Sequence, residues 1–139
     1  LRAGALQRGA ALVFLASISH HTGYPGAAVY AASKDVLAVY ASSIRRDLRH
    51  RGIHVTTVFP GPVRTQHAAR HAPAGADAER RMEPAVIAAA ILRAARRRKR
   101  VLYPGLQSKT GHVLGVLAPR WTTRFMHRTI FRKLDRTVY

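Results

Sequence analysis

The chain has 139 residues, with 24 Lys and Arg against 6 Asp and Glu, and a formal net charge of +18. Its hydrophobic content of 47% is normal for a globular protein and excludes wholesale disorder, while the absence of cysteine excludes disulfides and thiolate-bound metals. No run of about 18 apolar residues is present, so we expect no segment that spans a membrane.

Three short segments have the composition of buried strands. Residues 10–16 form a continuous apolar run, residues 53–59 are rich in β-branched side chains, and residues 101–103 form a third, shorter segment. Strands that alternate with helices predict a parallel α/β sheet with right-handed crossovers. Because three strands are few for a doubly wound sheet, the chain is predicted to be the C-terminal half of a larger α/β domain.

The segments between and after these strands have helical periodicity or loop composition. Apolar residues at helical spacing predict helices at residues 30–49, 83–97, 110–117 and 120–138. The side chains predicted to face the core from the first helix are Val36, Leu37, Tyr40, Ile44 and Leu48. Polar composition predicts a loop at residues 17–28, and a mobile loop or short helices at residues 65–81.

The start of the chain carries no recognisable targeting signal. Residue 1 is Leu and not Met, and residues 1–11 lack the charged-then-apolar order and the cleavage site of a secretory signal peptide. Together with the absence of cysteine, this predicts a cytoplasmic protein whose printed sequence begins inside a longer chain.

The basic residues are mostly arginine, with 20 Arg and 4 Lys, and they are concentrated toward the C-terminus. A sequence pI near 11.8 is typical of nucleic-acid-binding proteins. However, the chain contains no zinc-finger spacing, RNA-binding aromatic motif or basic leucine zipper. We therefore interpret the charge as a solvated face and do not expect a nucleic-acid partner.

Three side chains form a candidate catalytic group. Ser17 directly follows the first strand, at the sheet edge where open α/β proteins bind ligands. Tyr30 and Lys34 are four residues apart near the start of a helix, so they lie on one face. A lysine ammonium beside a tyrosine hydroxyl stabilises the phenolate, which favours proton transfer near neutral pH. Each of these residues alone is commonly found on a helix surface or in a turn. Only their spacing relative to one another indicates a catalytic site.

This spacing resembles the signature of the short-chain dehydrogenases/reductases. Tyr30 follows Ser17 by thirteen residues, and residues 30–34 read Tyr-Ala-Ala-Ser-Lys, a common form of the family's Tyr-x-x-x-Lys motif. Residues 59–65, Phe-Pro-Gly-Pro-Val-Arg-Thr, are similar to the family's Pro-Gly-x-Val-x-Thr segment. The motifs cover about residues 10–65, and the order of elements extends the resemblance to the rest of the chain.

The resemblance implies a Rossmann-type fold and hydride transfer between NAD or NADP and a small carbonyl/alcohol substrate. It assigns Tyr30 as general acid/base, Lys34 as the residue that assists it and holds the nicotinamide ribose, and Ser17 as the residue that orients the reacting oxygen. Further cofactor contacts are implied for Pro60, Gly61, Val63 and Thr65, and a substrate lid for residues 66–81. The resemblance also implies a homo-oligomer for the full-length protein.

The sequence departs from the family pattern at several points. The usual Gly three residues after the catalytic Ser is replaced by His20, and Ser19 offers a competing hydroxyl. The Gly-x-x-x-Gly-x-Gly phosphate-binding turn and the family's usual Asn on the helix before the Ser strand are absent from the 139 residues. The resemblance therefore places the chain at the fifth to seventh strands of a seven-stranded sheet, and we expect the isolated chain to be inactive.

The C-terminal segment permits a second interpretation. We divide the chain into residues 1–118, the partial catalytic domain, and residues 119–139, a basic amphipathic helix. The alternative function is a basic binding module that contacts an anionic membrane or nucleic acid through this arginine-rich segment. No metal site is predicted, because the adjacent His20 and His21 are not followed by further ligands at metal-binding spacing.

Overall fold

A computed structural model describes residues 6–70, 79 and 81–133. Three strands form its sheet, namely β1 (Ala11–Leu15), β2 (His54–Val58) and β3 (Val101–Leu102). They pair in parallel in the order β1-β2-β3, which confirms the predicted parallel α/β fold. The third strand is one residue shorter than predicted.

The central strand β2 is buried, although two of its residues carry hydroxyls. Thr56 donates its hydroxyl hydrogen bond to the carbonyl of Lys99 at 2.8 Å, and Thr57 Oγ1 accepts one from Arg45 Nη2 at 2.8 Å. Burial of a polar group is tolerated when it is hydrogen-bonded. These contacts explain how a strand with two threonines can occupy the middle of the sheet.

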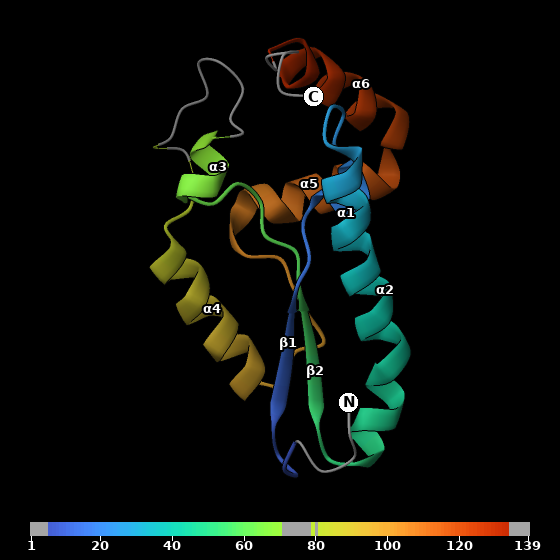
Figure 1. Cartoon of the computed structure of the whole chain (residues 1–139), viewed down its shortest axis with the longest axis vertical. Helices are drawn as coiled ribbons and strands as arrows, with labels where there is room; N and C mark the ends of the chain where they lie inside the picture. Colours follow the sequence, from blue (N-terminus) through green and yellow to red (C-terminus); the bar gives the residue numbers. More distant parts are fainter. Residues whose placement is uncertain (1–5, 71–78, 80, 134–139) are drawn as a thin grey trace.

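Two long helices, α2 (Ala28–His50) and α4 (Pro84–Arg96), cover opposite faces of the sheet (Figure 1). α2 ends before Gly52, whose φ of +74° lies in the left-handed region that glycine adopts readily. α4 begins with Pro84 in its first turn, where the missing N–H costs no helical hydrogen bond. Both helices match the predicted ranges to within two residues.

The predicted inward face of α2 is partly wrong. The residues that α2 buries include Ala38, Ala41 and Leu48, whereas Val36 and Tyr40 are 66% and 45% exposed. The alanines allow the helix to approach the sheet closely, which rotates the larger side chains outward. Tyr40 makes an edge contact with the ring of Phe14, which packs against the core.

The loop predicted at residues 17–28 contains a short helix, α1 (Ser19–Thr22). α1 packs against α5 (Gly105–Leu117), which begins five residues earlier than predicted because helical backbone starts directly after Pro104. Glycines on α5 permit this approach, since a Cβ at Gly115 would lie 2.4 Å from the carbonyl oxygen of His21. Tertiary packing therefore forms α1, which is too short to be stable alone.

The remaining elements lie in the regions predicted as a loop and as a C-terminal helix. α3 (Gln66–Arg70) occupies the start of the predicted lid, most of which falls outside the described residues. α6 (Pro119–Thr129) ends well before residue 138 and is followed by the 3-10 turn η1 (Phe131–Lys133). The last five residues of the predicted C-terminal helix, 134–138, also lie outside the described residues. No helix in the described ranges is long and apolar enough to cross a membrane.

Candidate active site

The candidate site lies where the carboxyl ends of β1 and β2 run side by side. The N–H of Ala16 donates to the carbonyl of Val58 at 2.9 Å, and the N–H of Ile18 donates to the carbonyl of Pro60 at 3.1 Å. These two bonds hold Ser17 beside the Pro60-Gly61 turn. The sheet thus brings together two of the segments that the sequence analysis singled out, as expected for parallel strands.

Ser17 is 7% exposed, and its hydroxyl oxygen accepts a hydrogen bond from the backbone N–H of Ser19 at 3.2 Å. This bond leaves the Ser17 hydroxyl hydrogen available to a reacting oxygen. The competing hydroxyl of Ser19 is also buried, and it has no hydrogen-bond partner among the described residues. Of these two hydroxyls, only that of Ser17 is fixed by a hydrogen bond.

Tyr30 and Lys34 lie in the first turns of α2, on the same side of the helix. The Lys34 ammonium is 5.8 Å from the centre of the Tyr30 ring, so it faces the ring rather than bonding the hydroxyl. The same ammonium donates a hydrogen bond to the carbonyl of Leu15, at the end of β1, at 3.3 Å. Tyr30 is 40% exposed and touches Tyr24 edge-on, and its hydroxyl has no hydrogen bond within the described part of the chain.

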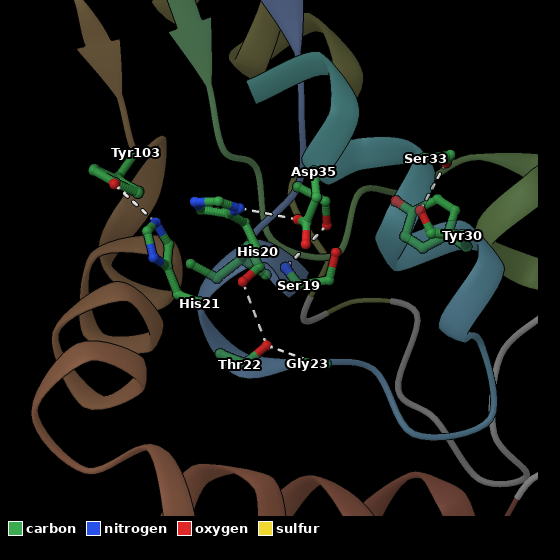
Figure 2. Close-up of polar contacts among 11 residues, drawn as sticks. Ser19, His20, His21, Thr22, Gly23, Tyr30, Ser33, Asp35 and Tyr103 are labelled. Carbon is green, nitrogen blue, oxygen red and sulfur yellow. Dashed lines mark hydrogen bonds and ion pairs between the residues drawn. The ribbon is translucent and has the colours of Figure 1, made fainter. Parts of the chain in front are cut away.

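The hydrogen bonds do not join Ser17 to Tyr30. Figure 2 shows Tyr30 apart from the cluster around Ser19 and Asp35, with its own carbonyl accepting a hydrogen bond from Ser33 Oγ. The predicted group of three is therefore only partly drawn together: Lys34 contacts both β1 and Tyr30, while Ser17 is held by its own loop. The segment of α2 that carries Tyr30 is exposed, so few contacts fix this side chain.

The turn after β2 is held from α5. The N–H of Gly61 donates to Ser108 Oγ at 2.8 Å, and a Cβ at residue 61 would lie 3.2 Å from the same oxygen. Further along, Val63 forms a parallel bridge with Met82, and Thr65 Oγ1 accepts the N–H of Ala68 at the start of α3. Glycine at residue 61 thus permits a close approach between the turn and α5.

A second cluster of polar rings adjoins this turn. His21 Nε2 and the Tyr103 hydroxyl are hydrogen-bonded at 3.0 Å, and the ring of Tyr103 stacks on His112 with centroids 4.2 Å apart. His20, at the position where the family motif has glycine, instead pairs with Asp35 of α2 through Nδ1 at 3.0 Å (Figure 2). Burial, together with the nearby His112 and His20, lowers the pKa of His21 to about 4. Burial also raises the pKa of Tyr103.

The comparisons with known proteins agree with the motifs. Residues 4–74, just over half of the chain, match the family model described as short chain dehydrogenase. The chain belongs to the short-chain dehydrogenase family. Because the matched range contains Ser17, Tyr30, Lys34 and Thr65, it includes the two motifs on which the resemblance rests.

Similar proteins include oxidoreductases of uncharacterised activity. "Uncharacterized oxidoreductase YxnA" of Bacillus subtilis is 32% identical over 142 residues, which cover 84% of this chain and 40% of that protein. "Uncharacterized oxidoreductase YbbO" of Escherichia coli K12 is 40% identical over 55 residues, covering 40% of this chain and 20% of that protein. The chain therefore spans less than half the length of these relatives.

Solved structures of the family have the same fold. A short-chain dehydrogenase from Burkholderia cenocepacia J2315 in complex with NADP superposes with a TM-score of 0.72 at 19% identity, over 85% of this chain and 47% of that one. A short-chain dehydrogenase from Sphingobium yanoikuyae in complex with NADPH gives a TM-score of 0.59 at 26% identity, over 88% of this chain and 44% of that one. These likenesses confirm the Rossmann-type architecture.

Residues that the sequence did not predict contribute much of the order at this edge of the sheet. Ser108 fixes Gly61 across 47 residues, and Tyr103 binds His21 across 82 residues. Contacts at such separations leave no local pattern in a single sequence. The adjacent His20 and His21 are noticeable in the sequence, but no contact of theirs was predicted beyond the absence of a metal site. In the structure, His20 pairs with Asp35, and His21 is hydrogen-bonded to Tyr103.

Proposed function

We propose that this chain forms the catalytic C-terminal half of an NAD- or NADP-dependent oxidoreductase that moves a hydride between the nicotinamide and a small carbonyl/alcohol substrate. The observation that carries the proposal is the β1–α2 unit. It presents Ser17, Tyr30 and Lys34 at the family's spacing, within the region that matches the family.

Tyr30 is the proposed general acid/base. Its hydroxyl is accessible and has no competing hydrogen bond in the described structure, so it is free to donate a proton to, or accept one from, the reacting oxygen. Lys34 lies against its ring and supplies the positive charge that stabilises the phenolate. Ser17, whose oxygen is fixed by the N–H of Ser19, orients the same reacting oxygen through its hydroxyl hydrogen.

The donors at this sheet edge fit the nicotinamide half of a dinucleotide. Lys34 donates one hydrogen bond to the carbonyl of Leu15 in the described structure, which leaves ammonium hydrogens for ribose hydroxyls. Thr65 accepts from Ala68 through its oxygen, which leaves its hydroxyl hydrogen for a carboxamide, and the backbone of Pro60, Gly61 and Val63 borders the same place. When bound, the nicotinamide supplies or accepts the hydride. Two of the similar structures hold NADP or NADPH, which supports this assignment.

The adenosine and pyrophosphate half of the dinucleotide would bind to a part of the protein outside these 139 residues. No Gly-x-x-x-Gly-x-Gly turn occurs among the 139 residues, and the chain covers less than half of its relatives. We infer that residues 1–118 complete a Rossmann domain supplied by a longer cytoplasmic protein, and that residues 119–139 form a basic appendage. The exposed apolar side chains of α2, which include Val29, Val36, Val39 and Tyr40, support a homo-oligomer that pairs through this helix.

The test uses the longer protein that contains this chain. Reduction of a panel of aldehydes and ketones is followed through the absorbance of NADH or NADPH, with the 139-residue chain assayed in parallel. We expect turnover by the longer protein and none by the isolated chain. Tyr30→Phe should lose turnover by about 10²–10⁴-fold while cofactor binding, measured by nicotinamide fluorescence, stays unchanged.

Tyr24→Phe is the matched control, because it removes a hydroxyl from the neighbouring ring and leaves the motif intact. It should keep most of the turnover. Retained turnover in Tyr30→Phe would refute the assigned proton-transfer role, and turnover by the isolated chain would refute the inference that a second half is needed.

A further inference from the structure

Helices α5 and α6 present an exposed surface that the proposed reaction does not use. They lie together at the end of the molecule toward which the strands run (Figure 1). Residues 105–133 contain no Asp or Glu, whereas α6 and the turn after it carry Arg120, Arg124, Arg128 and Arg132. The positive charge of this end is therefore not balanced by acidic residues of the same segment.

The side chains of α6 are sorted into three rows. Thr122, Met126 and Thr129 are half-buried and face the body of the protein. Arg120, Arg124 and Arg128 follow one another at intervals of four, so they form one row on the exposed side. Trp121 and Phe125, each one position further on, form the adjacent row and are 78% and 65% exposed.

Further exposed residues accompany both the arginine row and the aromatic row. The arginine row borders a hollow that is lined by Arg120, Thr123, Arg124, His127, Arg128 and Arg132. α5, which packs against α6, exposes further apolar side chains, among them Leu114, Val116 and Leu117, the last of these 77% exposed. α6 thus displays a row of arginines next to a row of aromatic rings, and α5 adds exposed aliphatic side chains.

We propose that α5 and α6 form a docking surface for an anionic lipid bilayer, with the arginines bound to lipid phosphates and Trp121 and Phe125 inserted at the level of the headgroups. Charge complementarity identifies the partner: cationic side chains are attracted to the negative cytoplasmic leaflet at short range. Aromatic side chains bury their apolar rings at that depth. This surface is formed by side chains other than Ser17, Tyr30 and Lys34, and it does not depend on the proposed reaction.

The combination of side chains favours a bilayer over the other partners of such a surface. A nucleic-acid backbone would engage the arginines, but it offers no apolar phase for Leu117 and Val116. A second copy of this chain would bring the same arginines face to face without acidic partners, which is unfavourable. A bilayer with anionic headgroups satisfies both rows at once.

Trp121 is the single tryptophan among these 139 residues, so the difference in emission between the longer protein and its Trp121→Phe variant reports on this surface. The protein is titrated with vesicles of phosphatidylcholine, and with vesicles in which about a third of the lipid is phosphatidylserine. We expect the emission to shift to shorter wavelength, and aqueous iodide to quench less, with the anionic vesicles only. Binding should weaken as salt is raised, because screening reduces the attraction.

Two pairs of substitutions test the two rows by co-sedimentation with the anionic vesicles. Arg124→Gln with Arg128→Gln should weaken partitioning roughly 30-fold, from about fivefold per arginine near such a surface. Trp121→Ala with Phe125→Ala should also reduce pelleting. The matched controls, on α4 and at the residue that follows it, are Arg93→Gln with Arg97→Gln, and Val86→Ala with Leu92→Ala. All four side chains are exposed, and these variants should pellet like the parent protein.

Circular dichroism of each variant checks that the helices remain folded. Equal pelleting of the α6 and α4 variants, or an unchanged Trp121 emission with anionic vesicles, would overturn the proposal. A shift that appears with protein concentration alone would replace the bilayer with a second copy of the chain. Binding to duplex DNA that is lost in the arginine variant and kept in the Trp121→Ala/Phe125→Ala variant, without vesicle binding, would replace it with a nucleic acid.

Discussion

The two sides of the candidate site are built differently. On the α2 side, Tyr30 is accessible, and the one hydrogen bond that Lys34 makes in the described structure goes to a carbonyl at the end of β1. On the α5 side, Gly61, Ser108, His21 and Tyr103 are tied by hydrogen bonds and ring contacts. The α2 side carries the candidate reactive groups and makes few contacts among them. The α5 side carries none of these groups, and its residues are joined by many contacts.

We interpret the α2 side as the side that carries the proposed reacting groups, and the α5 side as the side that holds the turn after β2 in place. A residue that exchanges protons with a ligand, as proposed for Tyr30, needs a hydroxyl that is not already hydrogen-bonded within the protein. A turn that borders a ligand must be held in one conformation, as Ser108 holds Gly61. Substitutions on the α2 side should therefore change activity more than stability, and substitutions on the α5 side should change stability first.

The largest expected effect is on turnover, from Lys34→Gln in the longer protein. Loss of the ammonium removes the charge beside Tyr30 and the donor proposed for the ribose, so kcat should fall about 100-fold and the KM for the cofactor should rise. The free energy of unfolding should change by less than about 1 kcal/mol, since one partly exposed hydrogen bond is lost.

Steady-state kinetics and urea unfolding measure both quantities. Lys109→Gln, on the exposed surface of α5, loses the same charge away from the site and should leave both unchanged. If Lys34→Gln lowered the free energy of unfolding and left kcat unchanged, the proposed division between a reactive α2 side and a supporting α5 side would be wrong.

The second prediction concerns the contact between α1 and α5. A Cβ at Gly115 would lie 2.4 Å from the carbonyl oxygen of His21, and this oxygen belongs to the backbone, so relief requires the helices to separate. Gly115→Ala should lower the free energy of unfolding, because overpacking costs about 1–3 kcal/mol and better helix propensity returns about 1 kcal/mol at most.

Gly111→Ala is the matched control. The new Cβ would lie 3.1 Å from a side-chain carbon of Ile18, which can move, so stability should change little. Thermal unfolding of both variants measures the difference. Equal melting temperatures would show that α1 does not rest closely on α5.

The sequence predicted the parts of this molecule whose signals are local. A continuous apolar run predicted the strand at residues 10–16, and β-branched composition predicted the strand at residues 53–59. Fixed motif spacing selected Ser17, Tyr30 and Lys34 as candidate site residues. It did not predict α1, because Ser-His-His-Thr is polar and becomes helical only where α5 packs on it. Tyr40 was assigned to the core by its helical spacing, but small alanines set the orientation of the helix instead.

The support of the site was not predictable for a different reason. The contact between Gly61 and Ser108 joins residues that are far apart in the sequence, and each taken alone is an ordinary turn or helix residue. The same holds for Tyr103, which follows a two-residue strand and meets His21 only through the fold. Such pairs are set by how α5 crosses the end of the sheet.

A smaller effect is expected from pH. Burial, His112 and His20 lower the pKa of His21 to about 4, against an ordinary value of 6.5, while Asp35 acts in the opposite direction. Between these values the unfolded chain binds a proton at this residue that the folded chain does not. Stability should therefore be complete above pH 6.5 and should fall as the pH is lowered toward about 4.

The measurement is the free energy of urea unfolding at several pH values in this window. For one proton the slope is at most about 1.4 kcal/mol per pH unit, and solvent screening at this partly exposed side chain reduces it. His21→Gln should remove this part of the slope, while His50→Gln, at the exposed end of α2, should retain it. Identical slopes in the two variants would assign the pH dependence to other groups.

The smallest expected effect is from Tyr103→Phe. The substitution keeps the ring that stacks on Phe59 and His112, but it removes the hydroxyl bonded to His21 Nε2. One hydrogen bond of this kind contributes about 0.5–1.5 kcal/mol. Unfolding in urea should show a loss in that range, with turnover of the longer protein nearly unchanged. If turnover fell while stability did not, Tyr103 would belong with the reactive groups of the α2 side, and the distinction between the two sides would have to be abandoned.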